Sequence, residues 1–211
     1  MKEAMNIVWL KRDLRLQDHL PFFEVENNSK CNYLPIYILE PSAMAYPDSS
    51  LRHVQFVYHS ILEMNSILAA FNRKIYILYG EAMEVFNSLN EQFDIQNVYS
   101  YQESGVKSTW DRDKNVSSFL QKNGIKWTEF QRDGIIRGIK NRVNWDKNWF
   151  IAVNSPLILN VYSHNTEPLK SLPFDFPNSL KETLQKYPDS FQKAGESYAM
   201  RYISSFCEGR G

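Results

Sequence analysis

Short apolar runs alternate with longer amphipathic segments along the first 130 residues of the chain. Five runs rich in β-branched and aromatic residues predict strands at residues 7–10, 33–39, 75–79, 97–101 and 125–130. Between them, apolar residues recur every three to four positions, which is the spacing of one helix face. Helices are therefore expected at residues 21–27, from about 50 to 72, around 85–93 and from about 107 to 122.

This alternation predicts an α/β fold: a Rossmann-like, three-layer α/β/α domain around a five-stranded parallel sheet. In such sheets, ligands bind beyond the carboxyl ends of the strands. The segments at that edge are residues 10–13, 39–41, 79–81 and 101–106. None contains a G-x-G-x-x-G motif or a phosphate-binding loop, so the two commonest nucleotide-binding motifs are absent from these segments.

The character of the sequence changes after residue 130. Residues 131–148 are polar and basic, and a short helix is expected at 145–153. Four prolines predict an extended linker, and apolar residues at helical spacing then predict a last helix at 194–207. We therefore divide the chain into an α/β domain at residues 1–160, a proline-containing linker at 161–193 and the opening of a second domain at 194–211.

Charge and cysteine content exclude several classes of protein. Lys and Arg total 24, as do Asp and Glu, and this neutral balance makes the chain alone a poor candidate for tight nucleic-acid binding. Two cysteines are too few for a disulfide framework, four scattered histidines predict no metal site, and no apolar run is long enough for a signal peptide or a membrane span. We expect a cytoplasmic protein without a bound metal.

Residues 8–19, VWLKRDLRLQDH, form the most distinctive motif in the chain. This motif resembles the opening of the DNA photolyase and cryptochrome family, where a strand ending in V-W-F precedes a basic residue, R-D-L-R and D-N or D-H. Residues 103–113, 134–145 and 191–206 are also similar to stretches of that family, the last to its F-x-x-G-G-E motif. The resemblance covers nearly the whole chain.

The resemblance implies that residues 1–160 are the N-terminal α/β domain of a DNA photolyase and that residue 194 begins its helical domain. In the family, that helical domain holds FAD, which when reduced and excited passes an electron to a pyrimidine dimer flipped out of DNA. The implied role of this chain is a scaffold that is not itself catalytic, so no catalytic residue is assigned. Its implied partners are its own helical FAD domain and, through that domain, UV-damaged DNA.

Some members of the family also hold an antenna chromophore in the α/β domain, which is a reduced folate, a deazaflavin or a flavin nucleotide. The candidate residues for such a site are Arg12, Asp13, Tyr37, Leu39, Arg52, Gln102 and Glu103. Folate-binding members commonly present a glutamate where this chain has Ser108 or Thr109, so the resemblance favours the other two chromophores. An empty site, with Arg12, Asp13 and Arg15 forming an ion-paired turn, is the alternative.

The basic segment has two functional interpretations beside that of a solvated loop. Its candidate residues, either for DNA phosphates or for acidic groups of the helical domain, are Arg132, Arg137, Lys140 and Arg142. We expect the five tryptophans to be core or interface side chains.

Two other functions remain open at this stage. One is a blue-light photoreceptor of the cryptochrome type, which shares the fold and FAD. The other is a stand-alone nucleotide-binding α/β protein. The choice of DNA lesion, the natural length and the oligomeric state also stay open.

Overall fold

A single parallel sheet forms the centre of the protein, whose computed structural model describes residues 1–29, 31–131, 134–138 and 140–210. The strand order is β3-β2-β1-β4-β5, and every neighbouring pair is parallel. The strands are β1 (Glu3–Leu10), β2 (Tyr33–Leu39), β3 (Tyr76–Tyr79), β4 (Phe93–Tyr101) and β5 (Lys126–Phe130). The predicted α/β fold and the number of strands are confirmed.

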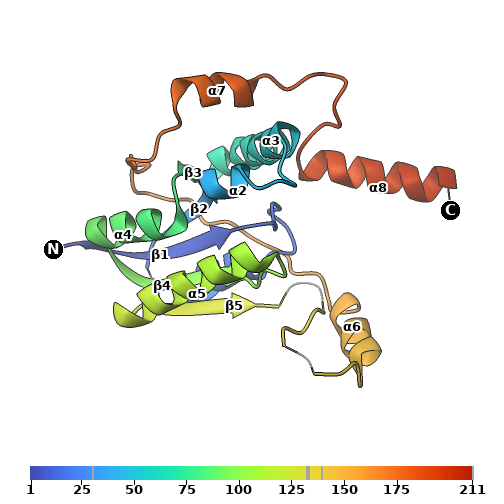
Figure 1. Ribbon diagram of the computed structural model, residues 1–211, viewed down its shortest axis with the longest axis horizontal. Helices are drawn as coiled ribbons and strands as arrows, with labels where there is room; N and C mark the ends of the chain where they lie inside the picture. Colours follow the sequence, from blue (N-terminus) through green and yellow to red (C-terminus); the bar gives the residue numbers. More distant parts are fainter. Residues whose placement is uncertain (30, 132–133, 139, 211) are drawn as a thin grey trace.

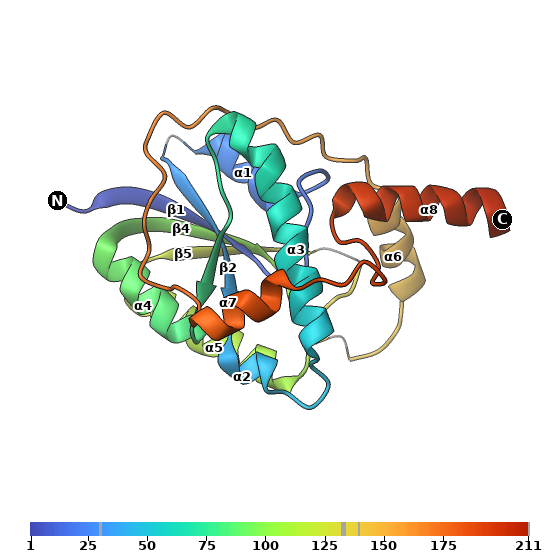
Figure 2. The same ribbon diagram turned by 90° about the horizontal axis from the view of Figure 1, so that it is seen from above.

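Helices cover both faces of this sheet (Figures 1 and 2). Along β1, Ile7 and Trp9 pack with apolar residues of α4 (Ala82–Gln92) and α5 (Lys107–Lys122). Val8 and Leu10 pack with residues of α1 (Leu20–Asn28) and α3 (Leu51–Leu68). Because successive side chains of a strand point to opposite faces, the apolar run of β1 fills two cores at once.

Several boundaries differ from those expected. Strands β1 and β4 begin earlier than predicted, since Glu3 pairs with Phe93 in the ladder. The helix expected to reach residue 72 ends at Leu68, followed by the 3₁₀-helix η1 (Ala69–Phe71). A short helix, α2 (Pro41–Met44), lies in the loop after β2, where no element was predicted.

The segment expected to be an extended linker contains a helix, α7 (Asn178–Gln185). Leu184 is fully buried and packs with Val54 and Tyr58 of α3. The amide of Gln55 donates a hydrogen bond of 2.9 Å to the carbonyl of Thr183. The prediction of a continuously extended segment was therefore wrong: one of the four prolines, at position 177, directly precedes the helix, where proline is well tolerated.

Two further helices, α6 (Trp145–Val153) and α8 (Glu196–Arg210), lie beyond the carboxyl ends of the strands (Figure 1). The sequence predicted α6 with the same boundaries. Among the helices that the structure describes, none is long and apolar enough to cross a membrane.

Candidate functional site

The order of the strands creates a switch point beside β1. The chain leaves β1 toward β2 and β3 on one side and then crosses to β4 and β5 on the other. In open α/β sheets, the crevice at the carboxyl ends of the strands flanking such a point is where ligands bind. Here the residues after β1 are Lys11, Arg12 and Asp13, and those after β4 are Gln102 and Glu103.

Arg112 of α5 occupies the centre of this crevice. Its guanidinium lies 2.8 Å from Glu40, 2.6 Å from Glu103 and 2.8 Å from Asp113. It also lies 5.0 Å from the centre of the Trp9 ring. Burial alone would lower the pKa of Arg112, but the three carboxylates raise it, so this side chain stays charged.

Lys11 is a second buried cation in the same crevice. Its ammonium lies 2.9 Å from Asp113 and 3.8 Å from Glu129. The rings of Trp9 and Trp127 are centred 4.4 and 5.1 Å from the same nitrogen. Burial lowers the pKa of Lys11, and Asp113 opposes that shift.

Arg12 and Arg137 close the group of charges from the outside. Arg12 lies 3.1 Å from Glu103, and Arg137 lies 3.5 Å from Glu129 and donates to the Glu103 carbonyl. We call the whole group the switch-point network; its residues are Lys11, Arg12, Glu40, Glu103, Arg112, Asp113, Glu129 and Arg137. Four cations balance four carboxylates, so side chains of the protein itself fill the crevice.

Asp13 takes part in a different contact. Its carboxylate lies 2.7 Å from Nε2 of the fully buried His19 and accepts the backbone N–H of Lys11 at 2.9 Å. Nδ1 of His19 in turn accepts the backbone N–H of Phe22 and caps α1. Arg15 pairs with Asp18 at 3.2 Å. Asp13 therefore fixes the first loop through His19, while Arg12 and Arg15 have other partners.

The structure brings only some of the other candidate residues to the crevice. Tyr37 lies at the crevice. Burial raises the pKa of its hydroxyl to about 12, and the negative charge of Glu103 is the second cause of this rise. Gln102 donates its backbone N–H to Phe130 at 2.8 Å. Leu39 packs in the core against α3, and Arg52 lies 4.8 Å from the ring of Phe191, so these two belong to the α3 side.

Sequence analysis missed Arg112 and Glu40. Arg112 stands in the W-D-R-D stretch at residues 110–113, which carried part of the family resemblance, so its motif was visible although its role was not. Glu40 directly follows β2 and was equally visible as a residue at the carboxyl edge.

A cleft of about 200 Å³ lies next to the switch-point network, between α2 and the first turns of α4 and α5. Apolar side chains line one part of it and hydroxyl and amide groups another; the lining includes Ala43, Tyr46, Ala82, Met83, Ser108, Thr109, Arg112 and Asn115. Glu81, at the start of α4, connects α4 to α2 at the cleft. Its carboxylate accepts hydrogen bonds from the N–H and hydroxyl of Ser42 at 2.9 and 2.7 Å. The cleft thus has mixed polarity.

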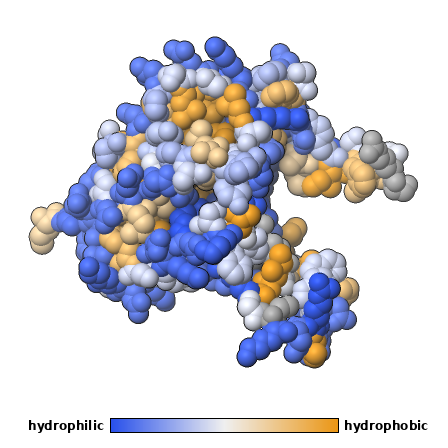
Figure 3. Space-filling view, viewed as in Figure 1, coloured by the Kyte–Doolittle hydropathy of each residue, from blue (hydrophilic) through white to orange (hydrophobic). Residues whose placement is uncertain are grey.

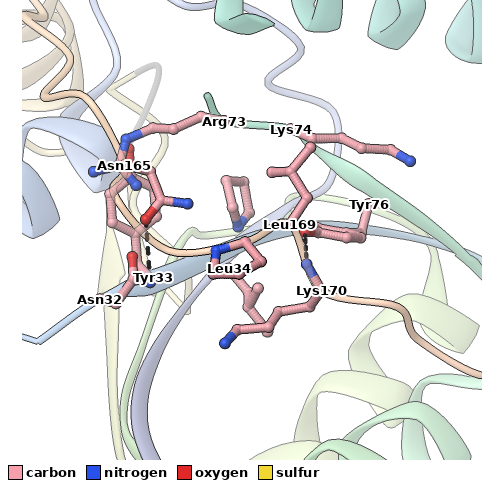
Figure 4. A pocket seen from close by; sticks show the side chains of 11 residues that line it. Asn32, Tyr33, Leu34, Arg73, Lys74, Tyr76, Asn165, Leu169 and Lys170 are labelled. Carbon is pink, nitrogen blue, oxygen red and sulfur yellow. Dashed lines mark hydrogen bonds between the residues drawn. The ribbon is translucent and has the colours of Figure 1, made fainter. Parts of the chain in front are cut away.

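A second hollow lies at the opposite edge of the sheet, where β2 and β3 begin (Figure 4). Its volume is about 20 Å³, which admits about one water molecule. Tyr76 accepts the backbone N–H of Lys170 there at 2.8 Å, and Arg73 pairs with Glu26 at 3.3 Å. At this hollow the segment around Lys170 is attached to the sheet. The hollow is too small for a ligand.

The candidates in the basic segment have different surroundings. Arg137 is tied to the switch-point network, whereas Lys140 and Arg142 are exposed. Arg132 lies outside the described residues. No cluster of three metal-ligating side chains occurs in the described part of the chain.

The tryptophans divide between the core and the surface. Trp9 is buried, Trp127 packs partly buried against the same core, and Trp110, Trp145 and Trp149 are exposed. The rings of Trp145 and Trp149 stack with centres 6.4 Å apart and planes 13° apart.

Comparison with known proteins gives one family and a consistent set of folds. The model of the family described as DNA photolyase matches residues 6–139. No curated protein matches the chain.

The solved structures that share the fold include the following three. A bacterial class III photolyase from Agrobacterium tumefaciens matches with a TM-score of 0.71 and 21% identity, over 99% of this chain and 45% of that one. An archaeal photolyase from Sulfolobus tokodaii, solved with two FAD molecules, matches with a TM-score of 0.68 and 17% identity. The match covers 98% of this chain and 46% of that one. A Synechocystis sp. PCC6803 cryptochrome matches with a TM-score of 0.75 and 17% identity. The match covers 99% of this chain and 47% of that one. The chain spans less than half the length of each.

Proposed function

Since the chain belongs to the DNA photolyase family, we propose that it is the α/β scaffold of a light-driven lyase that splits pyrimidine dimers in DNA. The observation that carries this proposal is the family match over residues 6–139 on a fold shared with two photolyases. The switch-point network supports a scaffold role, because its cations and carboxylates pair with one another.

The domain arrangement proposed for the longer protein follows from this assignment. Residues 1–160 form the α/β domain, residues 161–193 connect it and residues 194–211 begin a helical domain that binds FAD. That domain would supply the electron for repair and the contacts to damaged DNA. The partners of the α/β domain are then the helical domain directly and UV-damaged DNA through it.

An antenna chromophore is proposed for the cleft beside the network rather than for the crevice itself. A ring entering the crevice would have to displace Arg112 from its three carboxylates, whereas the cleft is open and partly apolar. Its volume of about 200 Å³ is at the small end for a ligand site, so it fits one flat ring system with the rest of the molecule outside. When bound, such a chromophore would absorb light and pass the energy to FAD.

The residues of this chain would hold the ring in specific ways. Met83 and Ala43 offer an apolar wall, and Ser108, Thr109 and Asn115 offer hydrogen-bonding groups. Of the candidates named from sequence, Glu103 would act from the adjoining network by holding Arg112 in place, and Arg12 pairs with the same Glu103. A flavin or deazaflavin ring is proposed ahead of a folate.

Lys140 and Arg142 are proposed as contacts to DNA phosphates or to acidic groups of the helical domain. Their exposure leaves them available for either partner, whereas Arg137 is already held by Glu129. Replacing Lys140 and Arg142 by alanine in the longer protein distinguishes a contact to DNA from a contact to the helical domain. A shallower salt dependence of DNA binding supports phosphate contact, and unchanged binding with lower stability supports the interdomain contact.

The second candidate function is a cryptochrome-type photoreceptor, which the match to the Synechocystis cryptochrome favours. Photorepair by the native-length protein decides between the two. The reduced protein is illuminated with blue light on an oligonucleotide that contains a thymine dimer. Loss of the dimer is the expected result, and an FAD-loaded protein that leaves the dimer intact overturns the lyase proposal.

The antenna proposal is tested on the 211-residue chain by fluorescence titration with flavin mononucleotide and with a reduced folate. We expect saturable binding that Met83→Trp abolishes by filling the cleft. Met200→Trp on the exposed surface of α8 is the matched control and leaves binding unchanged. Absence of saturable binding to the unaltered chain overturns the antenna site.

A further inference from the structure

The cleft beside the switch-point network lies between short pieces of helix. One wall is α2, which has only four residues, none of them buried, and contributes Ser42 and Ala43 to the lining. Another wall is the first turn of α4, which contributes Ala82 and Met83. A helix as short as α2 is not stable by propensity alone, so its position depends on the side chains that pack behind it.

Apolar residues of α7 and of the chain before it pack behind α2. Met44 of α2 is partly buried against a core cluster that includes Leu184 of α7. Phe176 and Leu180 pack against the same cluster. Figure 3 shows apolar side chains gathered on this face between α7 and α2. The α2 wall of the cleft is therefore joined to α7 through one shared core.

The start of α4 is supported in the same way by Phe174. This ring packs against the core cluster that contains Ala82, and Met83 packs against that cluster too. A Cβ added to Gly80 would lie 3.5 Å from the Phe174 ring, so the ring lies directly on the turn that leads into α4. The N–H of Tyr79 also donates to the Phe174 carbonyl at 3.4 Å. The second wall is therefore supported by the same returning segment of chain.

Side chains of α3 hold α7 at its C-terminal end (Figure 2). Nε2 of Gln55 donates to the carbonyls of Thr183 and Lys186 at 2.9 and 2.5 Å. Nε2 of His59 lies 2.9 Å from the carbonyl of Leu184. The last carbonyls of a helix have no partner within it, so these contacts satisfy groups that α7 cannot satisfy itself. They fix α7 on α3 at a defined position.

We propose that residues 172–187, which we call the strap, position the walls of the cleft, so that docking of the strap and binding of a flat ring are coupled. Among the described residues that line the cleft, none belongs to the strap, so the strap acts on a ligand only through α2 and α4. A ring that fits the cleft with its walls in place binds the docked form more tightly than the undocked form. By linkage, the ring must then stabilise the docked strap by the same factor. The inference rests on the proposed antenna site and adds Phe176 and Leu184 to it as positioning residues.

Leu184→Ala tests this coupling in the 211-residue chain. The substitution leaves a cavity beneath α7 and changes no side chain of the cleft. We expect flavin mononucleotide to bind at least fivefold more weakly in a fluorescence titration, and Leu184→Met to restore the affinity. Leu68→Ala is the matched control, since Leu68 is also fully buried but packs in a separate core cluster at the C-terminal end of α3. It should leave the affinity unchanged at equal folded fraction.

Hydrogen exchange gives a readout that needs no ligand. Amides 44–46 are hydrogen-bonded within α2 and the residues beside it. They should exchange at least tenfold faster in Leu184→Ala than in Leu68→Ala, because α2 loses its support. Gln55→Ala is a milder second variant that removes two hydrogen bonds to the strap and should act in the same direction. The test therefore does not depend on the folding of Leu184→Ala.

The reciprocal effect is measured in the unaltered chain. Saturating flavin mononucleotide should slow the exchange of amides 181–184 in α7 at least fivefold, because the bound ring stabilises the docked strap. The amides of α1, which lies outside the cleft and the strap, should exchange at an unchanged rate.

The outcomes distinguish the coupling from the antenna site itself. Saturable binding that Leu184→Ala and Leu68→Ala weaken equally overturns the coupling alone, and so does exchange in α7 that the flavin leaves unchanged. Unchanged exchange of amides 44–46 in both strap variants also overturns it, because α2 would then keep its position without the strap. Absence of saturable binding to the unaltered chain overturns the antenna site and the coupling together. Photorepair by the native-length protein tests the lyase proposal independently of all these results.

Discussion

Arg112 of α5 and Glu103 after β4 form a largely buried ion pair, with Nη2 of the first 2.6 Å from Oε2 of the second. The same guanidinium lies within 2.8 Å of Glu40 and Asp113, so one cation compensates three carboxylates. A buried carboxylate is tolerated only when it is paired and hydrogen-bonded. The stability of the switch-point network therefore depends on Arg112 more than on any one of its acids.

Replacing Arg112 by methionine should be strongly destabilising. The loss leaves Glu40, Glu103 and Asp113 without their shared partner, and breaking a buried pair in this way costs about 3–5 kcal/mol. Urea unfolding at pH 7 measures the loss. The deficit relative to the unaltered protein should shrink as the pH falls, because burial raises the pKa of Glu40 and the variant lacks Arg112, which opposes that shift.

Arg12→Met is the matched control for this prediction. The Arg12 side chain pairs with the same Glu103 but is 63% exposed, so its removal should change the free energy of unfolding by no more than about 1 kcal/mol. Equal losses in the two variants would show that the burial of Arg112 does not determine its contribution.

Asp13→Asn should remove part of the acid sensitivity of the protein. Burial alone would raise the pKa of Asp13, but His19 and the N–H of Lys11 outweigh it and lower the pKa below its ordinary value. A carboxylate with a lowered pKa in the folded state stabilises the protein above its unfolded pKa, and this contribution disappears as the pH falls through the folded pKa. The variant should therefore be less stable at pH 7 and lose less stability on acidification below pH 4.

Chemical unfolding of both proteins at pH 7 and at pH 3 measures this difference. Asp111→Asn serves as the control, because Asp111 is exposed on α5 and solvent screens its pairs with Lys107 and Lys114. It should leave the acid dependence close to that of the unaltered protein. An Asp13→Asn variant with the same acid dependence as the unaltered protein would show that the contact with His19 is not the cause.

The sequence predicted the sheet because each strand carries its own signal, a short apolar run between turns. It could not predict the switch-point network, since Glu40 and Arg112 are 72 residues apart and only the strand order β3-β2-β1-β4-β5 brings them together. The partner of Asp13 was missed for a local reason. His19 is only six residues away, but the nearby Arg12 and Arg15 offered a more obvious charge.

The helix α7 escaped prediction because its stabilising contacts are tertiary. Its eight residues carry Leu180 and Leu184 one helical turn apart, and both leucines pack into a core that includes Val54 and Tyr58 of α3. A helix this short is not stable by propensity alone, so tertiary packing must stabilise it.

Gly134→Ala should displace α6, whereas Gly138→Ala should not. Both glycines have a left-handed backbone, with φ of +71° and +72°, so both variants should lose about 1–2 kcal/mol from strain. Only at position 134 would the new Cβ also lie 3.1 Å from Cα of Trp149 and 3.2 Å from Cβ of Ala152. At position 138 it would meet no atom within 4 Å.

Near-UV circular dichroism can follow this displacement, because Trp145 and Trp149 stack on α6 and their coupling depends on geometry. We expect the tryptophan signal to change in Gly134→Ala and to remain in Gly138→Ala at equal folded fraction. Identical spectra for the two variants would mean that α6 moves with its neighbours and is not positioned by Gly134.

Gly195→Ala should loosen the first turn of α8 from the α/β body. Glu63 of α3 holds this turn by accepting the N–H of Ser197 at 3.3 Å and its hydroxyl. Gly195 has a φ of +112°, and an added Cβ would lie 2.8 Å from the carboxyl carbon of Glu63. The variant must therefore move Glu63 away from Ser197.

Hydrogen exchange should show amides 197–199 exchanging at least tenfold faster, while the strands keep their protection. Gly209→Ala, at a helical position with open space, should leave these amides unchanged. Unchanged exchange in Gly195→Ala would mean that Glu196 and its bond to Leu16 suffice to fix the first turn of α8.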